Sequence, residues 1–362
     1  ARAAELLQQA ERPLLILGKG VRWSASPARL TELVETLGMP FVPSPMGRGF
    51  IPDDHPLCMS SARSTALRGA DTVLVLGARL NWTFGMGRSF APEARFVHVD
   101  IHPEEIGLQR ETEAGIAGDA GAVVEQLLTV LDGYRADRTE SDWLGTLREA
   151  KAKNEAAIEP LLDSDQIPMT HHRLLREVRD ALPRDAIISV DGQITLATGR
   201  QVLPSYLPAS RLNSGANGCM GVGVPFAVGA KLAAPHRPVI SINGDCAFGF
   251  NGMEMETSLR HDAPVLFLID NNDGIMGSVL ESRMFSSPHQ ERVAMYLPGV
   301  RYDKIMEAFG GHAEHITDPD AVRPAVERAL RADRSTCLNV AVDPAAIWPI
   351  PTAGRASSLM GY

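Results

Sequence analysis

The sequence predicts an α/β protein with two doubly wound parallel-sheet domains. Short apolar runs alternate along the chain with segments of helical periodicity. Most of the runs are apolar throughout, as expected for strands that are buried on both faces of a parallel sheet. A charged stretch without strand signals separates two such patterns. The length of 362 residues leaves room for about two to three domains of ordinary size.

In the first half, the apolar runs are bounded by glycine, proline or aspartate, which is typical of strand ends. Strands are expected at 13–17, 40–43, 72–76 and 95–101, and helices with apolar periodicity at 26–37 and 121–131. These elements define a first domain over residues 1–132. The chain begins like the middle of an amphipathic helix, so we expect it to have been cut from a longer protein.

The charged segment 133–167 predicts a helical linker, and a second α/β domain follows over residues 168–345. Its elements are expected as helices at 170–182 and 302–309 and strands at 186–190, 238–242, 264–269 and 337–342. The remaining residues, 346–362, form an irregular tail.

The composition excludes several classes of protein. A content of 44% hydrophobic and 22% charged residues is ordinary for a globular enzyme and excludes disorder. The net charge of −9, without a basic stripe, predicts no nucleic-acid partner. No apolar run approaches the roughly 20 residues of a membrane helix, so we expect no membrane partner. Four widely separated cysteines without zinc-site spacing predict a reducing, cytoplasmic location.

Two polar turns predict a metal and phosphate site. Asp245 follows one apolar strand, and Asn272 follows the next. The carboxyl ends of parallel strands meet at one edge of the sheet, and carboxylate and amide oxygens suit Mg²⁺. Gly244 and Gly249 would let the backbone approach a diphosphate, and a helix from about Gly252 would offer its amides. The alternative is that two ordinary turns happen to contain Asp and Asn.

The spacing of Gly244-Asp245 and Asn271-Asn272 resembles the GDG…NN motif of thiamine diphosphate enzymes, with Cys246 in place of the third glycine. The segment from Asn217 to Ala230 resembles the family's G-x-M-G-x-x-x-P segment. There Met220 would support the bent cofactor; the alternative is a core methionine. The turn Val190–Gln193 resembles the one that contacts the diphosphate.

This resemblance implies thiamine diphosphate and Mg²⁺ as cofactors. The implied cofactor-binding residues are Gly192, Gln193, Gly218, Met220, Gly244, Asp245, Cys246, Ala247, Asn272, Gly274, Ile275 and Met276. The implied metal ligands are Asp245, Asn272 and Gly274. Members of the family also have a pyrimidine-binding domain whose glutamate activates the cofactor, and we expect it on another segment or chain. The resemblance further implies a homodimer or homotetramer with the active site between subunits.

Within the family, the segments Leu17–Gly20, Met46–Pro56 and Gly77–Trp82 are similar to those of 2-hydroxyacyl-CoA lyases and oxalyl-CoA decarboxylases. The resemblance implies that the first domain binds the CoA nucleotide, and it leaves open whether ADP is bound. The candidate contacts are Arg48, Arg79, Asn81, Asp100 and Asp119. The alternative for each arginine is a solvated surface charge. A dinucleotide fingerprint is excluded because Trp23 stands where a third small residue is needed.

Two features favour the lyase within this group. Glu281 stands where we expect a tyrosine in the decarboxylases, and its carboxylate could move the hydroxyl proton of a 2-hydroxyacyl substrate. The alternative is a surface glutamate. Ala353 replaces the serine of the decarboxylase pattern in the tail, where Arg355 is the candidate CoA contact. The sequence thus favours reversible cleavage of a 2-hydroxyacyl-CoA to formyl-CoA and an aldehyde or ketone; oxalyl-CoA decarboxylation and a non-catalytic cofactor- and CoA-binding module are the alternatives.

The histidines are expected to play structural roles. His171 and His172 are adjacent, so they point to different sides of a helix, and we expect an exposed pair at its N-terminus. His98 lies in an apolar strand and is expected in the core.

Overall fold

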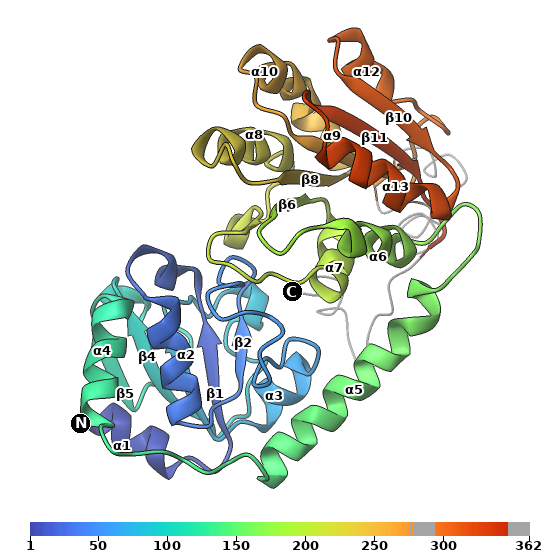
Figure 1. Cartoon of the computed structure of the whole chain (residues 1–362). Helices are drawn as coiled ribbons and strands as arrows, with labels where there is room; N and C mark the ends of the chain where they lie inside the picture. The colour runs from blue at the N-terminus through green and yellow to red at the C-terminus, as the bar shows by residue number, and fades with distance from the viewer. Residues whose placement is uncertain (276, 278–293, 347–362) are drawn as a thin grey trace. The chain divides into compact units, whose positions relative to one another are not determined.

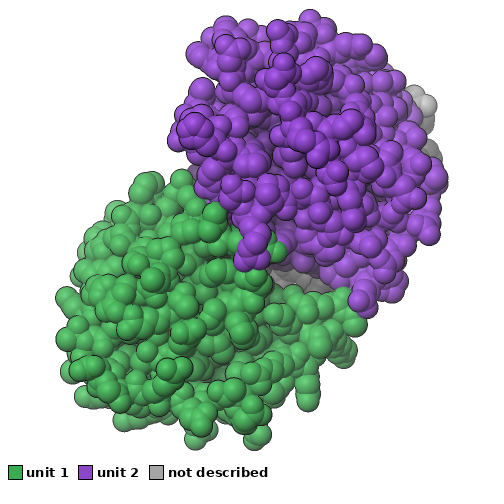
Figure 2. Space-filling view, viewed as in Figure 1, with its two compact units in different colours: residues 1–157, 205–209, 353–362 green, residues 158–204, 210–352 purple. Residues whose placement is uncertain are grey.

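The computed structural model describes residues 1–275, 277 and 294–346. The described chain forms two compact units (Figures 1 and 2). Unit 1 comprises Ala1–Ala157 together with Ser205–Ala209. Unit 2 comprises Ile158–Pro204 and the described residues from Ser210 onward. The domain boundaries expected from the sequence stay predictions.

Unit 1 contains a five-stranded parallel sheet with the order β2-β1-β3-β4-β5. Its strands are β1 (Pro13–Leu17), β2 (Phe41–Pro43), β3 (Thr72–Leu76), β4 (Arg95–Asp100) and β5 (Ala114–Ala117). Its helices are α1 (Arg2–Gln9), α2 (Pro27–Thr36), α3 (Arg63–Gly69), α4 (Ala120–Val130) and α5 (Asp142–Leu162), the last of which runs into unit 2. Three 3₁₀ turns are η1 (Lys19–Trp23), η2 (Trp82–Phe84) and η3 (Pro103–Glu105).

Both faces of this sheet are covered, which explains why its central strands are apolar throughout. Successive side chains of a strand point to opposite faces. In β1, Leu15 and Leu17 pack with α1, α2 and α4, whereas Leu14 and Ile16 pack with α3 and α5. The helices therefore enclose two cores, one on each side of the sheet.

Unit 2 contains a six-stranded parallel sheet with the order β10-β11-β9-β8-β6-β7. Its strands are β6 (Ile187–Asp191), β7 (Arg211–Leu212), β8 (Val239–Gly244), β9 (Leu266–Asn271), β10 (His312–Ile316) and β11 (Thr336–Ala341). Its helices are α6 (His171–Ala181), α7 (Gln193–Val202), α8 (Gly223–Ala233), α9 (Asp245–Asn251), α10 (Met255–Arg260), α12 (Asp303–Ala308) and α13 (Pro319–Leu330), with η4 (Gly215–Asn217) and η5 (Gly252–Glu254) as 3₁₀ turns.

The second sheet is also buried on both faces (Figure 1). Helices α6, α7 and α13 pack on one face, and α8, α9, α10 and α12 pack on the other. The carboxyl ends of β6, β8 and β9 lie side by side because these strands are neighbours and parallel. The polar turns that follow these three strands are thereby brought to one edge of the sheet.

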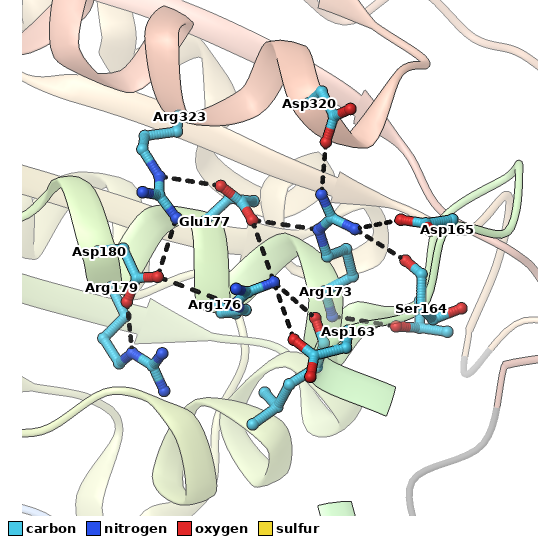
Figure 3. A network of polar contacts seen from close by, with 12 residues as sticks. Asp163, Ser164, Asp165, Arg173, Arg176, Glu177, Arg179, Asp180, Asp320 and Arg323 are labelled. Atoms are coloured by element: carbon cyan, nitrogen blue, oxygen red, sulfur yellow. Dashed lines mark hydrogen bonds and ion pairs between the residues drawn. The ribbon is translucent and has the colours of Figure 1, made fainter. Parts of the chain in front are cut away.

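An ion-pair network connects α6 with α13 within unit 2 (Figure 3). At its centre is Glu177, whose side chain is only 7% exposed. Its carboxylate contacts Arg173 Nε at 3.1 Å and Arg323 Nε at 3.0 Å. Arg173 also reaches Asp165 and Asp320. We call this cluster the Glu177 network.

The fold class predicted from the sequence is confirmed, with two parallel sheets covered by helices. Each expected strand and helix is present with ends shifted by a few residues at most, except that the linker helix is confined to Asp142–Leu162. The sequence patterns missed β5, β7 and β10. Strands β5 and β10 lie at sheet edges and are partly exposed, so they lack the continuous apolar signal of a central strand.

The structure differs from two local expectations. A helix, α9, already begins at Asp245, because β8 leads directly into it, and the helical segment expected from about Gly252 follows as η5 and α10. His171 and His172 are buried, with 3% and 2% exposure, because the first turn of α6 lies against β9 and α7. His98 is buried as expected, with Nε2 at 3.2 Å from the Ala78 carbonyl oxygen.

The described helices include none with the length and apolar character needed to cross a membrane. All four cysteines are free thiols.

Candidate active site

Asp245 joins two turns at the carboxyl edge of the second sheet. Its side chain is buried at the junction of β8 and α9. One carboxylate oxygen, Oδ1, accepts a hydrogen bond from the Cys246 amide at 2.6 Å. The other, Oδ2, accepts one from the Gly274 amide at 2.8 Å. The carboxylate thus connects the turn after β8 to the turn after β9.

Asn272 and Gly274 lie in the second of these turns. The orientation that satisfies the buried Asn272 amide has its nitrogen donating to the Gly274 carbonyl at 2.9 Å and its oxygen accepting from the Gly277 amide at 3.2 Å. A Cβ on Gly274 would lie 2.6 Å from the Ala294 carbonyl oxygen, so only glycine fits there. The three residues expected to hold the metal are therefore close together.

The electrostatics of this cluster suit a cation. Burial raises the pKa of Asp245 to about 7, and the hydrogen bonds from the Cys246 and Gly274 amides offset only part of this effect. The nearby carboxylates of Asp270 and Asp273 act in the same direction as burial. A divalent cation would stabilise the ionised form of such a carboxylate. Carboxylate, side-chain amide and backbone carbonyl oxygens fit Mg²⁺.

The turn after β6 touches the turn after β8 through glycines. Gly192 has φ +98°, a conformation that side-chain-bearing residues rarely adopt. A Cβ on Gly192 would lie 3.1 Å from the Gly244 amide nitrogen. The two backbones therefore lie next to each other without side chains between them, which lets a diphosphate come close to the main chain. The residues present fit the cofactor implied by the sequence.

Met220 lies in an exposed loop between η4 and α8. Its side chain is 39% exposed, which excludes the alternative of a core methionine. Gly218 and Gly221 on either side of it have φ +63° and +93°, so the loop depends on glycine at both positions. An exposed apolar side chain held by a tight loop is suited to support an aromatic ring.

The other predicted cofactor contacts have varied surroundings. Gln193 is the first residue of α7, and Ala247 is buried in α9. The Ile275 amide donates to the Ala294 carbonyl at 2.7 Å. Met276, Glu281, Arg355 and the tail from residue 347 lie outside the described residues.

Sequence reasoning missed a buried polar cluster beside this site. Asp270, at the end of β9, accepts a hydrogen bond from Thr195 Oγ1 at 2.8 Å, and its carboxylate oxygens lie 2.8 and 2.9 Å from His171 Nδ1. Thr195 lies in α7 and also faces Gly244, since a Cβ on Gly244 would lie 3.3 Å from the Thr195 hydroxyl oxygen. These three residues are far apart in the sequence, so no local motif could reveal them.

Two tyrosines complete the surroundings of Asp245. Burial is the main cause that raises the pKa of the Tyr296 phenol, and a hydrogen bond with Cys246 adds to it. Burial and the charge of Asp245 raise the pKa of Tyr302 to about 12. The Tyr302 ring also packs edge-on against Phe248, with 5.5 Å between centroids. Both phenols thus stay neutral hydrogen-bond donors near the carboxylate.

In unit 1, the strand order changes direction between β1 and β3. In doubly wound sheets, ligands bind at the carboxyl ends of the strands at such a point. The backbones of Gly18 and Gly77 are in contact there, because a Cβ on Gly18 would lie 2.0 Å from the Gly77 carbonyl oxygen. Gly20 donates its amide to the same carbonyl at 2.8 Å.

The predicted nucleotide contacts lie at this same edge, in the loops after the strands or, for Asp100, at the end of β4, but several already bond to neighbouring residues. Arg48 is buried in an ion pair with Asp53 at 2.6 Å, which favours a structural role. The Asn81 side chain accepts from Thr83. Asp100 accepts from the His102 amide, and Asp119 caps α4. Arg79 is 56% exposed in its ion pair with Glu105, so its guanidinium can reach a ligand.

Comparison with known proteins assigns this architecture to a class of enzymes. Residues 1–127 match the family described as "Thiamine pyrophosphate enzyme, central domain". Residues 192–340 match "Thiamine pyrophosphate enzyme, C-terminal TPP binding domain". The chain therefore belongs to the family of thiamine pyrophosphate (thiamine diphosphate) enzymes. The resemblance inferred from the sequence motifs is confirmed.

Among relatives, the human protein "2-hydroxyacyl-CoA lyase 1" is 37% identical over 358 residues, which cover 95% of this chain and 62% of the human protein. A rice "2-hydroxyacyl-CoA lyase" is 38% identical over 354 residues, covering 95% of this chain and 61% of the rice protein. "Oxalyl-CoA decarboxylase" of Escherichia coli K12 is 36% identical over 348 residues, which cover 95% of this chain and 61% of the E. coli protein. The chain thus spans about three fifths of the length of these relatives.

Proposed function

We propose that this chain is part of a thiamine diphosphate-dependent lyase. The enzyme would cleave a 2-hydroxyacyl-CoA reversibly to formyl-CoA and an aldehyde or ketone. The main support is the cluster of Asp245, Asn272 and Gly274, together with the identity to 2-hydroxyacyl-CoA lyases. Bound thiamine diphosphate supplies a site that takes up the negative charge left when a carbon–carbon bond breaks.

The residues of this chain would bind and position the reactants. Asp245, Asn272 and the Gly274 carbonyl would hold Mg²⁺ against the diphosphate. Gly192 and Gly244 would let the backbone approach the diphosphate, and Met220 would support the thiamine ring. The carboxylate of Glu281 would move the hydroxyl proton of the substrate.

The carboxyl ends of β1 and β3 in unit 1 are the proposed site for the CoA nucleotide. Arg79 has an exposed guanidinium at this edge of the sheet and would contact a phosphate. Asp100 and Asp119 would contact the ribose and the adenine, and Arg355 would cover the bound CoA. The homodimer or homotetramer, the active site between subunits and the cytoplasmic location belong to the same proposal.

Binding of the cofactor tests the site directly. We expect calorimetry on the 362-residue chain to detect thiamine diphosphate only when Mg²⁺ is present, and the Asp245→Ala substitution to abolish that binding. Asp333→Ala is the matched control, since this carboxylate of the same unit is 88% exposed. Binding that survives Asp245→Ala would refute the assignment of the metal site.

Oxalyl-CoA decarboxylation is the second candidate, since the decarboxylase of E. coli is nearly as similar as the lyases. The complete gene product should be incubated with a 2-hydroxyacyl-CoA and, separately, with oxalyl-CoA, while formyl-CoA is measured. Formyl-CoA from the 2-hydroxyacyl-CoA is expected. Turnover of oxalyl-CoA alone would establish the decarboxylase instead, and turnover of neither would favour a non-catalytic binding module.

The role of Glu281 separates a catalytic group from a surface charge. The Glu281→Gln substitution is expected to abolish lyase turnover while thiamine diphosphate binding persists. An unchanged rate would show that this carboxylate takes no part in the reaction.

A further inference from the structure

One buried carboxylate joins the diphosphate turn to the loop of Met220. Asp191 is the last residue of β6 and is 4% exposed. Its Oδ1 accepts from the Gly192 amide at 2.8 Å. Its Oδ2 accepts from the amides of Gly221 and Gly223, both at 2.8 Å. A single side chain therefore bonds to backbone amides of two separate segments.

The Met220 loop is also held from its other side. The Gly221 carbonyl accepts from Asn251 Nδ2 at 2.7 Å, so the amide and the carbonyl of Gly221 are both bonded to side chains of other elements. The packing is close, because a Cβ on Gly223 would lie 2.8 Å from the Asp191 Cβ and 2.1 Å from Asn243 Oδ1. Met220 directly precedes this fixed peptide and is 39% exposed.

We propose that Asp191 is a positioning residue for the cofactor site, holding the Met220 loop in place relative to the diphosphate turn. This inference rests on the proposed function, which gives Met220 and Gly192 their contacts with the cofactor. An ionised carboxylate suits this task, since it can accept several hydrogen bonds and its bonds to amides are stronger than neutral ones. The asparagine isostere would instead direct N–H groups at one or more of these amides.

Hydrogen exchange in the ligand-free chain gives the first test. The Asp191→Asn substitution is expected to speed exchange at the Gly221 and Gly223 amides by about tenfold or more. Exchange in the central strand β8 should stay within about twofold of the wild type. Unchanged exchange at Gly221 and Gly223 would overturn the proposal. Should Asp191→Asn not fold, Asp191→Ser provides a smaller acceptor, and the same two amides are followed.

Binding gives the second test, with two probes that differ in the thiamine group. Calorimetry with Mg²⁺ should show that Asp191→Asn weakens the binding of thiamine diphosphate by about tenfold. The binding of inorganic diphosphate should weaken by less than about threefold. In a chain that already carries Met220→Ala, Asp191→Asn should weaken the binding of thiamine diphosphate by less than about a further twofold, because its effect acts through Met220. Equal weakening of both probes, or full additivity with Met220→Ala, would contradict a positioning role.

A buried carboxylate elsewhere in unit 2 serves as the control. Asp303 bonds to Arg301 and Asn339. Asp303→Asn is expected to lower the melting temperature without changing the ratio of the two affinities. If the wild-type chain binds neither probe, the proposed function fails, whereas the exchange experiment still decides whether Asp191 holds the loop.

Discussion

Gly192 illustrates how single residues constrain the cofactor site. Its φ is +98°, and a Cβ at this position would lie only 3.1 Å from the Gly244 amide nitrogen, so alanine is poorly accommodated. Gly192→Ala is therefore expected to lower the free energy of unfolding by about 1–3 kcal/mol. Gly229, an exposed residue of α8 with free space around it, is the control, and Gly229→Ala should raise stability by about 0.5–1 kcal/mol. Urea denaturation measures both.

His172 predicts a loss of stability in acid. Burial lowers its pKa, and the hydrogen bond with Gln201 and the charge of Asp270 only partly oppose this. Above pH of about 6.5 the histidine is neutral in both the folded and the unfolded chain. Below that pH the unfolded chain takes up a proton that the folded chain does not bind, so stability falls as the pH is lowered.

The expected slope from this histidine is at most about 1.4 kcal/mol per pH unit. His172→Gln should reduce the slope of unfolding free energy against pH between about pH 6.5 and 5. His261→Gln alters an exposed histidine and should leave the slope unchanged. Equal slopes in wild type and His172→Gln would contradict the assignment.

The sequence allowed Asp245, Asn272 and Gly274 to be placed together, because neighbouring parallel strands bring their carboxyl ends to one edge. It did not show Tyr296 or the partners of Asp191, because those contacts join loops that are far apart in the chain. Adjacent histidines were expected to be exposed, but two different elements cover the first turn of α6.

At the scale of elements, the Glu177 network predicts how strongly α6 and α13 depend on each other. Glu177→Gln removes the charge that Arg173 and Arg323 share and leaves their guanidinium groups less well compensated. Arg173 keeps its ion pairs with Asp165 and Asp320. We therefore expect the free energy of unfolding to fall by about 1–3 kcal/mol while the chain stays folded. As a control, Glu327→Gln in α13 breaks an exposed pair with Arg331, the residue after this helix, and should lower the free energy of unfolding by at most about 0.5 kcal/mol. If Glu177→Gln lowers the free energy of unfolding by as little as this control does, solvent compensates the charges of the two arginines.

Central and edge strands differed in how well their sequences predicted them. Strands β1, β3, β8 and β9 are buried on both faces, so their residues are mostly apolar and easily recognised. In β10, His312 and Glu314 lie among the apolar residues, because an edge strand has solvent beside it. Such a strand is defined by its neighbour β11 more than by its own composition.

For the whole molecule, the two units predict a selective response to ligands. A ligand that binds the folded state raises stability by about 2.7 kcal/mol when its concentration is about one hundred times its dissociation constant. Thiamine diphosphate with Mg²⁺ should therefore slow hydrogen exchange in unit 2, whereas CoA should slow it in unit 1. A chelator should abolish the first effect only. Protection in the opposite unit would refute the assignment of the two sites.

A contact within unit 1 joins residues that the ribosome makes at widely separated times. The buried Arg48–Asp53 pair is completed by Ser205, whose amide donates to the Asp53 carboxylate at 2.7 Å and whose carbonyl accepts from the Asp53 amide at 3.0 Å. The ribosome makes this partner only after β6 and α7 of the other unit. The first unit thus emerges with a buried carboxylate that has Arg48 beside it but lacks its second hydrogen-bond donor, which lies 152 residues further along the chain. The final consolidation of unit 1 is therefore expected to be a late event of co-translational folding.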